Sequence, residues 1–175
     1  LSQIKSFHEN GNKIVFIEGD VDSGKSSLCA QFVRSNLNNT ISVFFNPNSE
    51  IDYNVDYYCS NFIPQARHII GSDKDRNVDI FNPENYRRTI FELRKHLKHK
   101  RHKINIIIDG LENKLDEQNS FINQILDLIP FGEDIFNIVL TGNKNKYFKI
   151  KPQLDSNQHN TLRLVGFSKS EIQIY

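Results

Sequence analysis

Several residue types are scarce in this sequence, and each scarcity excludes a class of protein. Of 175 residues only Cys29 and Cys59 are cysteines, and their spacing is not that of a metal site, so we expect two buried thiols in a cytoplasmic chain. No run of about 18 apolar residues occurs, which excludes a membrane-spanning helix. Methionine and tryptophan are absent, and we assign no function to that absence.

The sequence also lacks a large excess of either positive or negative charge, and it lacks the features that would indicate several domains. The formal net charge is +1, so no overall field favours nucleic acid or a membrane surface as a partner. No signal peptide, internal repeat or low-complexity linker is recognisable, and the first residue is Leu1. We therefore expect one domain over residues 1–175, cut from a longer multidomain protein.

The most informative motif is Gly19-Asp20-Val21-Asp22-Ser23-Gly24-Lys25-Ser26, which has the G-x-x-x-x-G-K-S pattern of a phosphate-binding P-loop. In such a loop, successive backbone N–H groups wrap a phosphate at the positive end of the following helix. Lys25 is expected to reach the β- and γ-phosphates of a nucleotide, and the Ser26 hydroxyl to bind Mg²⁺. The predicted nucleotide-binding residues are Gly19, Asp22, Ser23, Gly24, Lys25, Ser26 and Ser27.

The context of the motif supports this interpretation over a chance glycine-rich turn. Residues 13–18 form a short apolar run that predicts a buried strand, and residues 26–36 place Leu28, Phe32 and Val33 at helical spacing. Further strands are predicted at 41–45, 104–109, 135–141 and 161–165. Helices are predicted at 1–9, at 52–63 with Pro64 ending or kinking it, from Asn82 to Leu97, and at 120–129 with Phe121, Ile125 and Leu128 inward. A last helix is predicted to begin near Ser168 and Glu171. This alternation indicates an α/β fold with a mostly parallel sheet covered on both faces.

Two other predicted strands end in polar residues that would complete a nucleotide site. Ile104-Asn105-Ile106-Ile107-Ile108-Asp109 is a good Walker B strand, whose Asp109 would hold a Mg²⁺-bound water, although an Asp-Gly turn is the alternative. Glu112 could orient or deprotonate an attacking water, or be a solvated loop residue. Asn143 or Thr141, at the end of the 135–141 strand, could sense the γ-phosphate, or belong to a simple turn.

After the P-loop come Ile106-Ile107-Ile108-Asp109-Gly110-Leu111-Glu112 and then Leu140-Thr141-Gly142-Asn143. The order of these motifs resembles the STAND class of signalling NTPases, which are relatives of AAA+ ATPases. The resemblance implies a three-layer P-loop NTPase fold of the additional-strand type, with five strands and the 135–141 strand between the P-loop and Walker B strands. It also implies ATP with Mg²⁺ as ligands, Lys25, Glu112 and Asn143 as catalytic residues, and Ser26 and Asp109 as metal ligands. Members commonly oligomerise when they sense a target, and many bacterial members act in antiviral defence.

The sequence departs from the class at two positions. Many relatives carry a second acidic residue where this chain has Asn113, and many carry Ser-Arg where it has Gly142-Asn143. The predicted function is a slowly hydrolysing, Mg²⁺-dependent ATP switch of a signalling or defence protein that controls oligomerisation. A small-substrate kinase, with Arg87, Arg88 and Arg94 as lid arginines, and a non-hydrolysing ATP-binding scaffold are the alternatives.

A basic run from Arg94 to Lys103 remains outside this interpretation. It holds six Lys or Arg residues and three His residues, at 96, 99 and 102, with no acidic residue. A row at spacing three rotates around a helix, so the His residues are not expected to bind a metal. Contact with nucleic acid is possible on charge, but the run lacks interleaved aromatic residues. The simpler interpretation is a set of solvated cations that favour the helix dipole.

Overall fold

The computed structural model describes residues 1–46, 48, 49, 54–71, 81–98, 100, 102–114, 120–156 and 158–165. Five strands form one sheet in the order β2-β3-β4-β1-β5, and every neighbouring pair is parallel. Their bounds are β1 Ile14–Glu18, β2 Thr40–Phe44, β3 Ile104–Asp109, β4 Phe136–Thr141 and β5 His159–Arg163. The predicted α/β fold is confirmed, and β4 lies between β1 and β3 as the resemblance implied.

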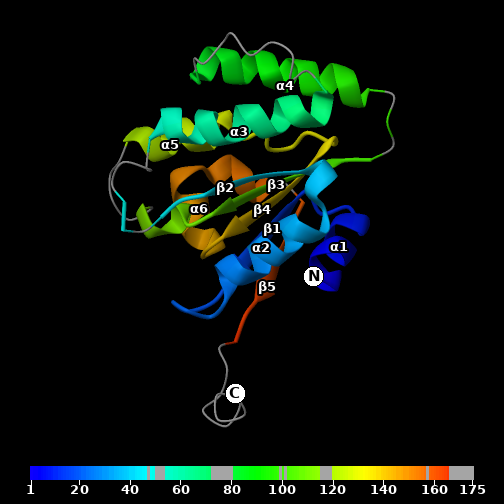
Figure 1. Cartoon of the computed structure of the whole chain (residues 1–175). Coiled ribbons are helices and arrows are strands. Elements are labelled where there is room, and N and C mark those ends of the chain that lie inside the picture. The colour runs from blue at the N-terminus through cyan, green and yellow to red at the C-terminus, as the bar shows by residue number, and fades with distance from the viewer. Residues whose placement is uncertain are drawn as a thin grey trace.

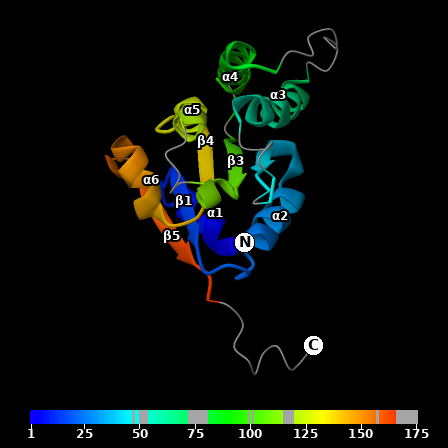
Figure 2. The same cartoon turned by 90° about the vertical axis from the view of Figure 1, so that its left-hand side faces the viewer.

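Helices cover both faces of this sheet, and one helix forms a further layer (Figures 1 and 2). Their bounds are α1 Ser2–Glu9, α2 Lys25–Ser35, α3 Val55–Ile70, α4 Pro83–Leu97, α5 Ser120–Leu128 and α6 Lys144–Ile150, with short 3-10 helices at Leu37–Asn39, Leu111–Lys114 and Pro152–Ser156. α1 and α2 cover one face, while α3, α5 and α6 cover the other. α4 packs on the outer side of α3.

The strands alternate their buried side chains between these two faces. In β1, Val15 and Ile17 pack in a core with Ile4 of α1 and Phe32 of α2. Ile14 and Phe16 point to the larger core that α3, α5 and α6 cover. Burial on both faces explains why the central strands are mostly apolar instead of alternating polar and apolar residues. No helix in the described part of the chain is long and apolar enough to cross a membrane.

The prediction that a helix ends or kinks at Pro64 is wrong in its bounds. α3 continues through Pro64 to Ile70, and Gly71 ends it with φ +77°. A proline inside a helix removes one hydrogen bond and costs about 3 kcal/mol. Two fully buried side chains next to Pro64, Ile63 and Ala66, together with partly buried Ile69 and Ile70 in the last turn, offset that cost.

Three smaller differences come from weak sequence signals. β5 begins and ends two residues earlier than predicted, because it lies at the sheet edge with partly exposed side chains. α5 buries Ile122, Ile125 and Leu126, whereas its Phe121 and Leu128 are only partly buried. α6 was not predicted, since its sequence is mostly polar, yet Tyr147 within it is fully buried. The predicted helix start near Ser168 lies outside the described residues.

Candidate functional site

The P-loop leaves β1 at its carboxyl end and enters α2 at Lys25. Asp22 and Gly24 take positive φ values, +61° and +89°, and Asp22 is the one described residue other than glycine to do so. Such a conformation is strained for an L-residue and is concentrated at functional loops. A Cβ on Gly19 would come within 2.5 Å of Ser23 Oγ and 2.8 Å of Leu164 O. Packing therefore requires glycine at position 19, and backbone conformation favours it at position 24.

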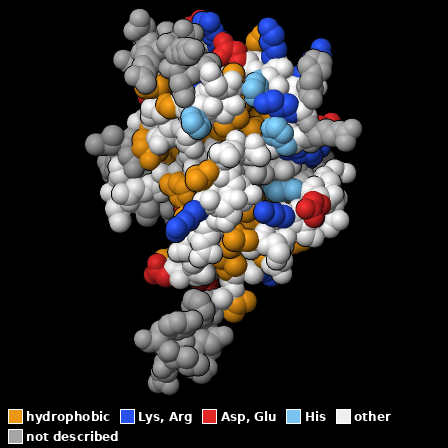
Figure 3. Space-filling model, turned by 45° about the vertical axis from the view of Figure 1, so that its right-hand side comes forward, with side chains coloured by type: hydrophobic (Ala, Val, Ile, Leu, Met, Phe, Trp, Pro, Cys, Tyr) orange, Lys and Arg blue, Asp and Glu red, His pale blue; other side chains and the backbone are white. Residues whose placement is uncertain are grey.

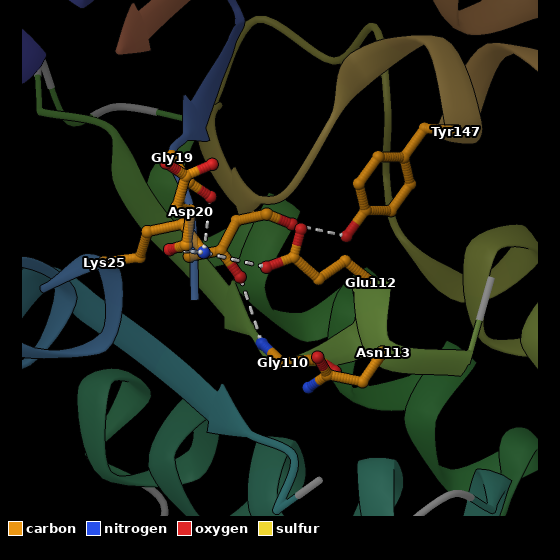
Figure 4. A network of polar contacts seen from close by, with 8 residues as sticks. Gly19, Asp20, Lys25, Gly110, Glu112, Asn113 and Tyr147 are labelled. Atoms are coloured by element: carbon orange, nitrogen blue, oxygen red, sulfur yellow. Dashed lines mark hydrogen bonds and ion pairs between the residues drawn. The ribbon is translucent and has the colours of Figure 1, made fainter. Parts of the chain in front are cut away.

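The ammonium group of Lys25 is the centre of the site (Figure 4). Its Nζ donates to the carbonyl oxygens of Gly19 at 2.8 Å and Asp20 at 3.0 Å, and it lies 3.3 Å from Oε1 of Glu112. An ammonium has three N–H donors, so these three acceptors saturate it. The loop around it is open, since Gly19, Gly24, Ser26 and Ser27 are all exposed. Ser23 Oγ is buried without a hydrogen-bond partner among the described residues.

Glu112 reaches Lys25 from the 3-10 helix that follows β3. Its side chain lies against Gly142, where an added Cβ would come within 2.5 Å of the Glu112 Cβ and 2.9 Å of its Cδ. Gly142 itself is fixed, because its N–H donates to Ile17 O at 2.8 Å. The sequence could suggest Glu112, but not that a glycine at the end of β4 makes room for it.

The ends of β3 and β4 are joined by Thr141. Its Oγ1 accepts a 3.0 Å hydrogen bond from the Gly110 N–H, and the Tyr147 hydroxyl donates to its carbonyl oxygen at 2.7 Å. Gly110 has φ +81°, and a side chain there would collide with the carbonyl oxygen of Phe45. These contacts fix the turn that follows Asp109.

Asp109 is 5 % exposed and lies at the carboxyl end of β3. Burial raises the pKa of the Cys29 thiol above its usual range, and the charge of Asp109 raises it further. Ile107, two residues before Asp109 in β3, packs with Cys29 of α2, and side chains two apart in a strand share one face of the sheet. Asp109 therefore lies on the face that α2 covers, and α2 also carries Ser26. Within the described residues no group of three or more His, Cys, Asp or Glu side chains is arranged to hold a metal. A Mg²⁺ site does not require one, because Mg²⁺ is usually held by one or two carboxylates with waters and phosphate oxygens.

The predicted sensor Asn143, and Asn113, where many relatives carry an acidic residue, lie at the same edge with local contacts of their own. Asn143 is exposed, and its Oδ1 accepts from the Asn145 N–H as the N-cap of α6. The Asn113 amide donates to Gly110 O at 2.9 Å, so it is directed to the turn and not to Lys25.

One residue beside the site was missed by sequence reasoning. Glu18, the last residue of β1, accepts from the Lys144 N–H at 3.1 Å, and its other oxygen lies 3.3 Å from Arg163 Nε. It ties the ends of β4 and β5 to the strand that carries the P-loop. Glu18 precedes the motif by one residue, and the motif pattern gives it no signal.

Comparison with known proteins supports the fold. A search of solved structures finds a Walker-type ATPase of Pyrococcus abyssi with a TM-score of 0.65 and 13 % identity. The match covers 97 % of this chain and 53 % of that chain, so this chain spans about half the length of that ATPase. Neither a scan against protein-family models nor a search of curated proteins gives a match. With the parallel sheet and strand order, this likeness shows that the chain has the α/β fold of P-loop NTPases.

Proposed function

We propose that this chain binds ATP with Mg²⁺ and hydrolyses it slowly. The observation that carries the proposal is the Lys25 ammonium, held by two loop carbonyls and Glu112 at the carboxyl ends of β1, β3 and β4. In open α/β sheets, ligands bind outside the carboxyl ends of the strands. The open loop, its positive φ angles and the unpartnered Ser23 hydroxyl fit a phosphate group.

Each residue would act on the phosphates in a defined way. Lys25 would exchange the carbonyl and carboxylate oxygens for β- and γ-phosphate oxygens, and the exposed loop would donate backbone N–H groups. Ser26 and Asp109 would hold Mg²⁺, which neutralises phosphate charge when bound. Because phosphoryl transfer leaves little covalent chemistry to the protein, positioning of these groups dominates the rate.

Glu112 would become the base once a nucleotide draws Lys25 away. Its carboxylate, freed from the ion pair and held against Gly142, would orient and deprotonate a water for attack on the γ-phosphate. Asn143 at the end of β4 would sense that phosphate, after giving up its cap on α6. The Lys25–Glu112 ion pair must break before Lys25 can bind phosphate and before Glu112 can act as the base, which supports slow turnover.

Nucleotide titration with and without Mg²⁺ tests the binding step. We expect ATP to bind wild type, and Lys25→Ala to weaken that binding by at least about tenfold, because charge-assisted contacts to phosphate are lost. Lys5→Ala, which removes an exposed charge from α1, is the control and should bind ATP as wild type does. Titration with GTP shows whether binding depends on the nucleobase, and titration with ADP shows whether it depends on the γ-phosphate. Absence of binding at millimolar nucleotide, or binding that ignores Lys25, would overturn the proposal.

We further propose that this domain is the switch of a signalling or defence protein whose oligomeric state follows the nucleotide. The resemblance to STAND NTPases supports this role, and light scattering on the full-length protein with ATP or ADP tests it. A kinase receives less support, because Arg88 and Arg94, two of the arginines considered for a lid, pair with Glu92 and Glu133. A non-hydrolysing scaffold is distinguished by binding without phosphate release.

A further inference from the structure

Positive charge is concentrated at one edge of this molecule. The chain holds 22 basic and 21 acidic residues, yet the run from Arg94 to Lys103 contains six of the basic residues and none of the acidic ones. The rest of the chain therefore carries 16 basic and 21 acidic residues. The formal net charge is near zero because the excess of acidic residues in the rest of the chain balances the basic run.

The basic run begins in the last turn of α4 and continues to the residue before β3. All strands are parallel, so this is the amino edge of the sheet, opposite the carboxyl edge that carries the P-loop. Its described residues Lys95, Lys98, Lys100, His102 and Lys103 are all exposed, and we call these five the basic edge. Figure 3 shows Lys, Arg and His side chains gathered in the upper right part of the face in view.

Most cations of the basic edge are not neutralised. Lys95, Lys98, His102 and Lys103 make no hydrogen bond or ion pair with any residue that the structure describes. Among the described residues, the Lys100 ammonium contacts the ring of His96, whose pKa is lowered by burial and by the nearby Lys100 and His102. By contrast, Arg94 is paired with Glu133, and Lys13 with Asp134.

The helix dipole does not account for this surface. Cations in the last turn of a helix favour the dipole, but the effect falls off within that turn. α4 ends at Leu97, so Lys100, His102 and Lys103 lie beyond it. Asp134, whose pKa is lowered by its pairing with Lys13, is close enough to Lys103 for the Lys103 charge to lower that pKa further. No described acidic side chain forms an ion pair with these residues, which is a feature expected of a surface for an anionic partner.

We propose that the basic edge binds the phosphate backbone of duplex nucleic acid. The run has a single apolar residue, Leu97, which is 2 % exposed, so it offers no group to insert into a lipid surface. It has no Phe, Tyr or Trp, so it lacks the large aromatic side chains on which the unstacked bases of a single strand stack. A surface whose charge comes mainly from exposed lysines suits the dense and regular charge of a duplex, about one phosphate per 1.7 Å of axis.

The proposal predicts weak, sequence-independent and strongly salt-dependent binding. Dissociation constants of about 10⁻⁴ to 10⁻⁶ M are typical of such contacts at physiological salt. If about four cations replace counterions, the slope of log K against log salt is about −3.6. Raising salt from 50 to 200 mM would then weaken binding by about 150-fold. Duplex binding should not change when ATP binds or is hydrolysed, because the P-loop lies at the opposite edge of the sheet.

Fluorescence anisotropy with a labelled duplex of about 20 base pairs tests this inference. The patch variant Lys95→Gln, Lys98→Gln, Lys103→Gln should bind at least about 30-fold more weakly than wild type at 50 mM salt. The matched control Lys144→Gln, Lys146→Gln, Lys149→Gln removes the same charge from α6 and should bind within about threefold of wild type. Lys25→Ala should bind the duplex as wild type does, whether or not it binds ATP.

Three results would overturn the proposal. The first is no binding of the duplex at 50 mM salt. The second is equal loss in the patch and control variants, which would reduce the effect to bulk charge. The third is that phosphatidylserine vesicles or polyglutamate bind in a patch-dependent way while the duplex does not, which would assign the surface to a lipid or protein partner. Circular dichroism of both triple variants checks that they are folded.

Discussion

The replacement Gly142→Ala tests how this site is built, because it acts on Glu112 without changing any ionisable group. Gly142 has φ +115°, and the added Cβ would lie 2.5 Å from the Glu112 Cβ. Atoms do not approach so closely, so one of the two residues must move. The backbone of Gly142 is held by its 2.8 Å hydrogen bond to Ile17 O. We therefore expect Glu112 to be displaced and its contact with Lys25 to be lost.

The expected cost follows from two contributions. An L-residue with positive φ costs about 1–2 kcal/mol. The Lys25 and Glu112 side chains are 13 % and 22 % exposed, so loss of this partly solvated pair adds about 1 kcal/mol. Gly142→Ala should lower the free energy of unfolding by about 2–3 kcal/mol in total. If Glu112 is the base, ATP turnover should also fall by about 100-fold or more.

Gly71→Ala is the matched control for the backbone contribution. Gly71 has φ +77°, and nothing lies within 4 Å of an added Cβ, so this variant should lose only about 1 kcal/mol and keep its turnover. Urea unfolding of both variants measures the cost of backbone strain at positive φ. Phosphate release by both variants measures the effect of displacing Glu112. Wild-type turnover by a folded Gly142→Ala protein would refute the placement of Glu112 as base.

Three other predictions concern the core and the two faces of the sheet. Tyr86→Phe should lower the free energy of unfolding by about 1–2 kcal/mol without affecting turnover, because the 2.7 Å hydrogen bond from the buried Tyr86 hydroxyl to the Leu128 carbonyl is lost; an unchanged urea midpoint would contradict this. Burial lowers the pKa of His8 below 6.5 in the folded chain, so the unfolded chain binds the proton more readily, and stability should fall as pH drops below about 6.5. His8→Gln should remove part of that pH dependence; an unchanged pH profile would argue against it. Burial raises the pKa of Cys59 to about 12, so a thiol reagent at pH 8 should label it only after unfolding, and rapid labelling of the native chain would show that it is accessible.

Much of the architecture was predictable because buried parallel strands leave strong signals. The strands that are covered on both faces are mostly apolar runs, broken only by single polar residues such as Asn105 and Asn137 before their polar ends. Asn82 with Pro83 marks the start of α4 as predicted, and the Asn82 Oδ1 accepts from the Asn85 N–H. Where a strand lies at the edge, as β5 does, the signal weakens and its bounds shift. The length of α3 was not predictable from Pro64, because the burial of residues beyond it outweighs the local penalty.

The site was predictable in its parts but not in its contacts. Spacing alone points to Lys25, Ser26 and Asp109, since each follows a strand or opens a helix at the same sheet edge. That Glu112 meets Lys25 depends on the adjacency of β3, β4 and β1, and on the room that Gly142 leaves. The role of Glu18 in tying three strand ends together depends on the same adjacency. Such pairings between distant segments have no local sequence pattern.

Whether this domain hydrolyses ATP with Lys25 and Glu112 is best tested by measuring phosphate release from ATP with Mg²⁺ and no added acceptor. We expect slow release by the wild-type protein and loss of it in both Lys25→Ala and Glu112→Gln. We also expect that Glu112→Gln still binds ATP, and more tightly than wild type, because the competing carboxylate charge beside Lys25 is gone. Undiminished release by Glu112→Gln would contradict the role of Glu112, and Lys25-dependent ATP binding without any release would make this domain a nucleotide-binding scaffold.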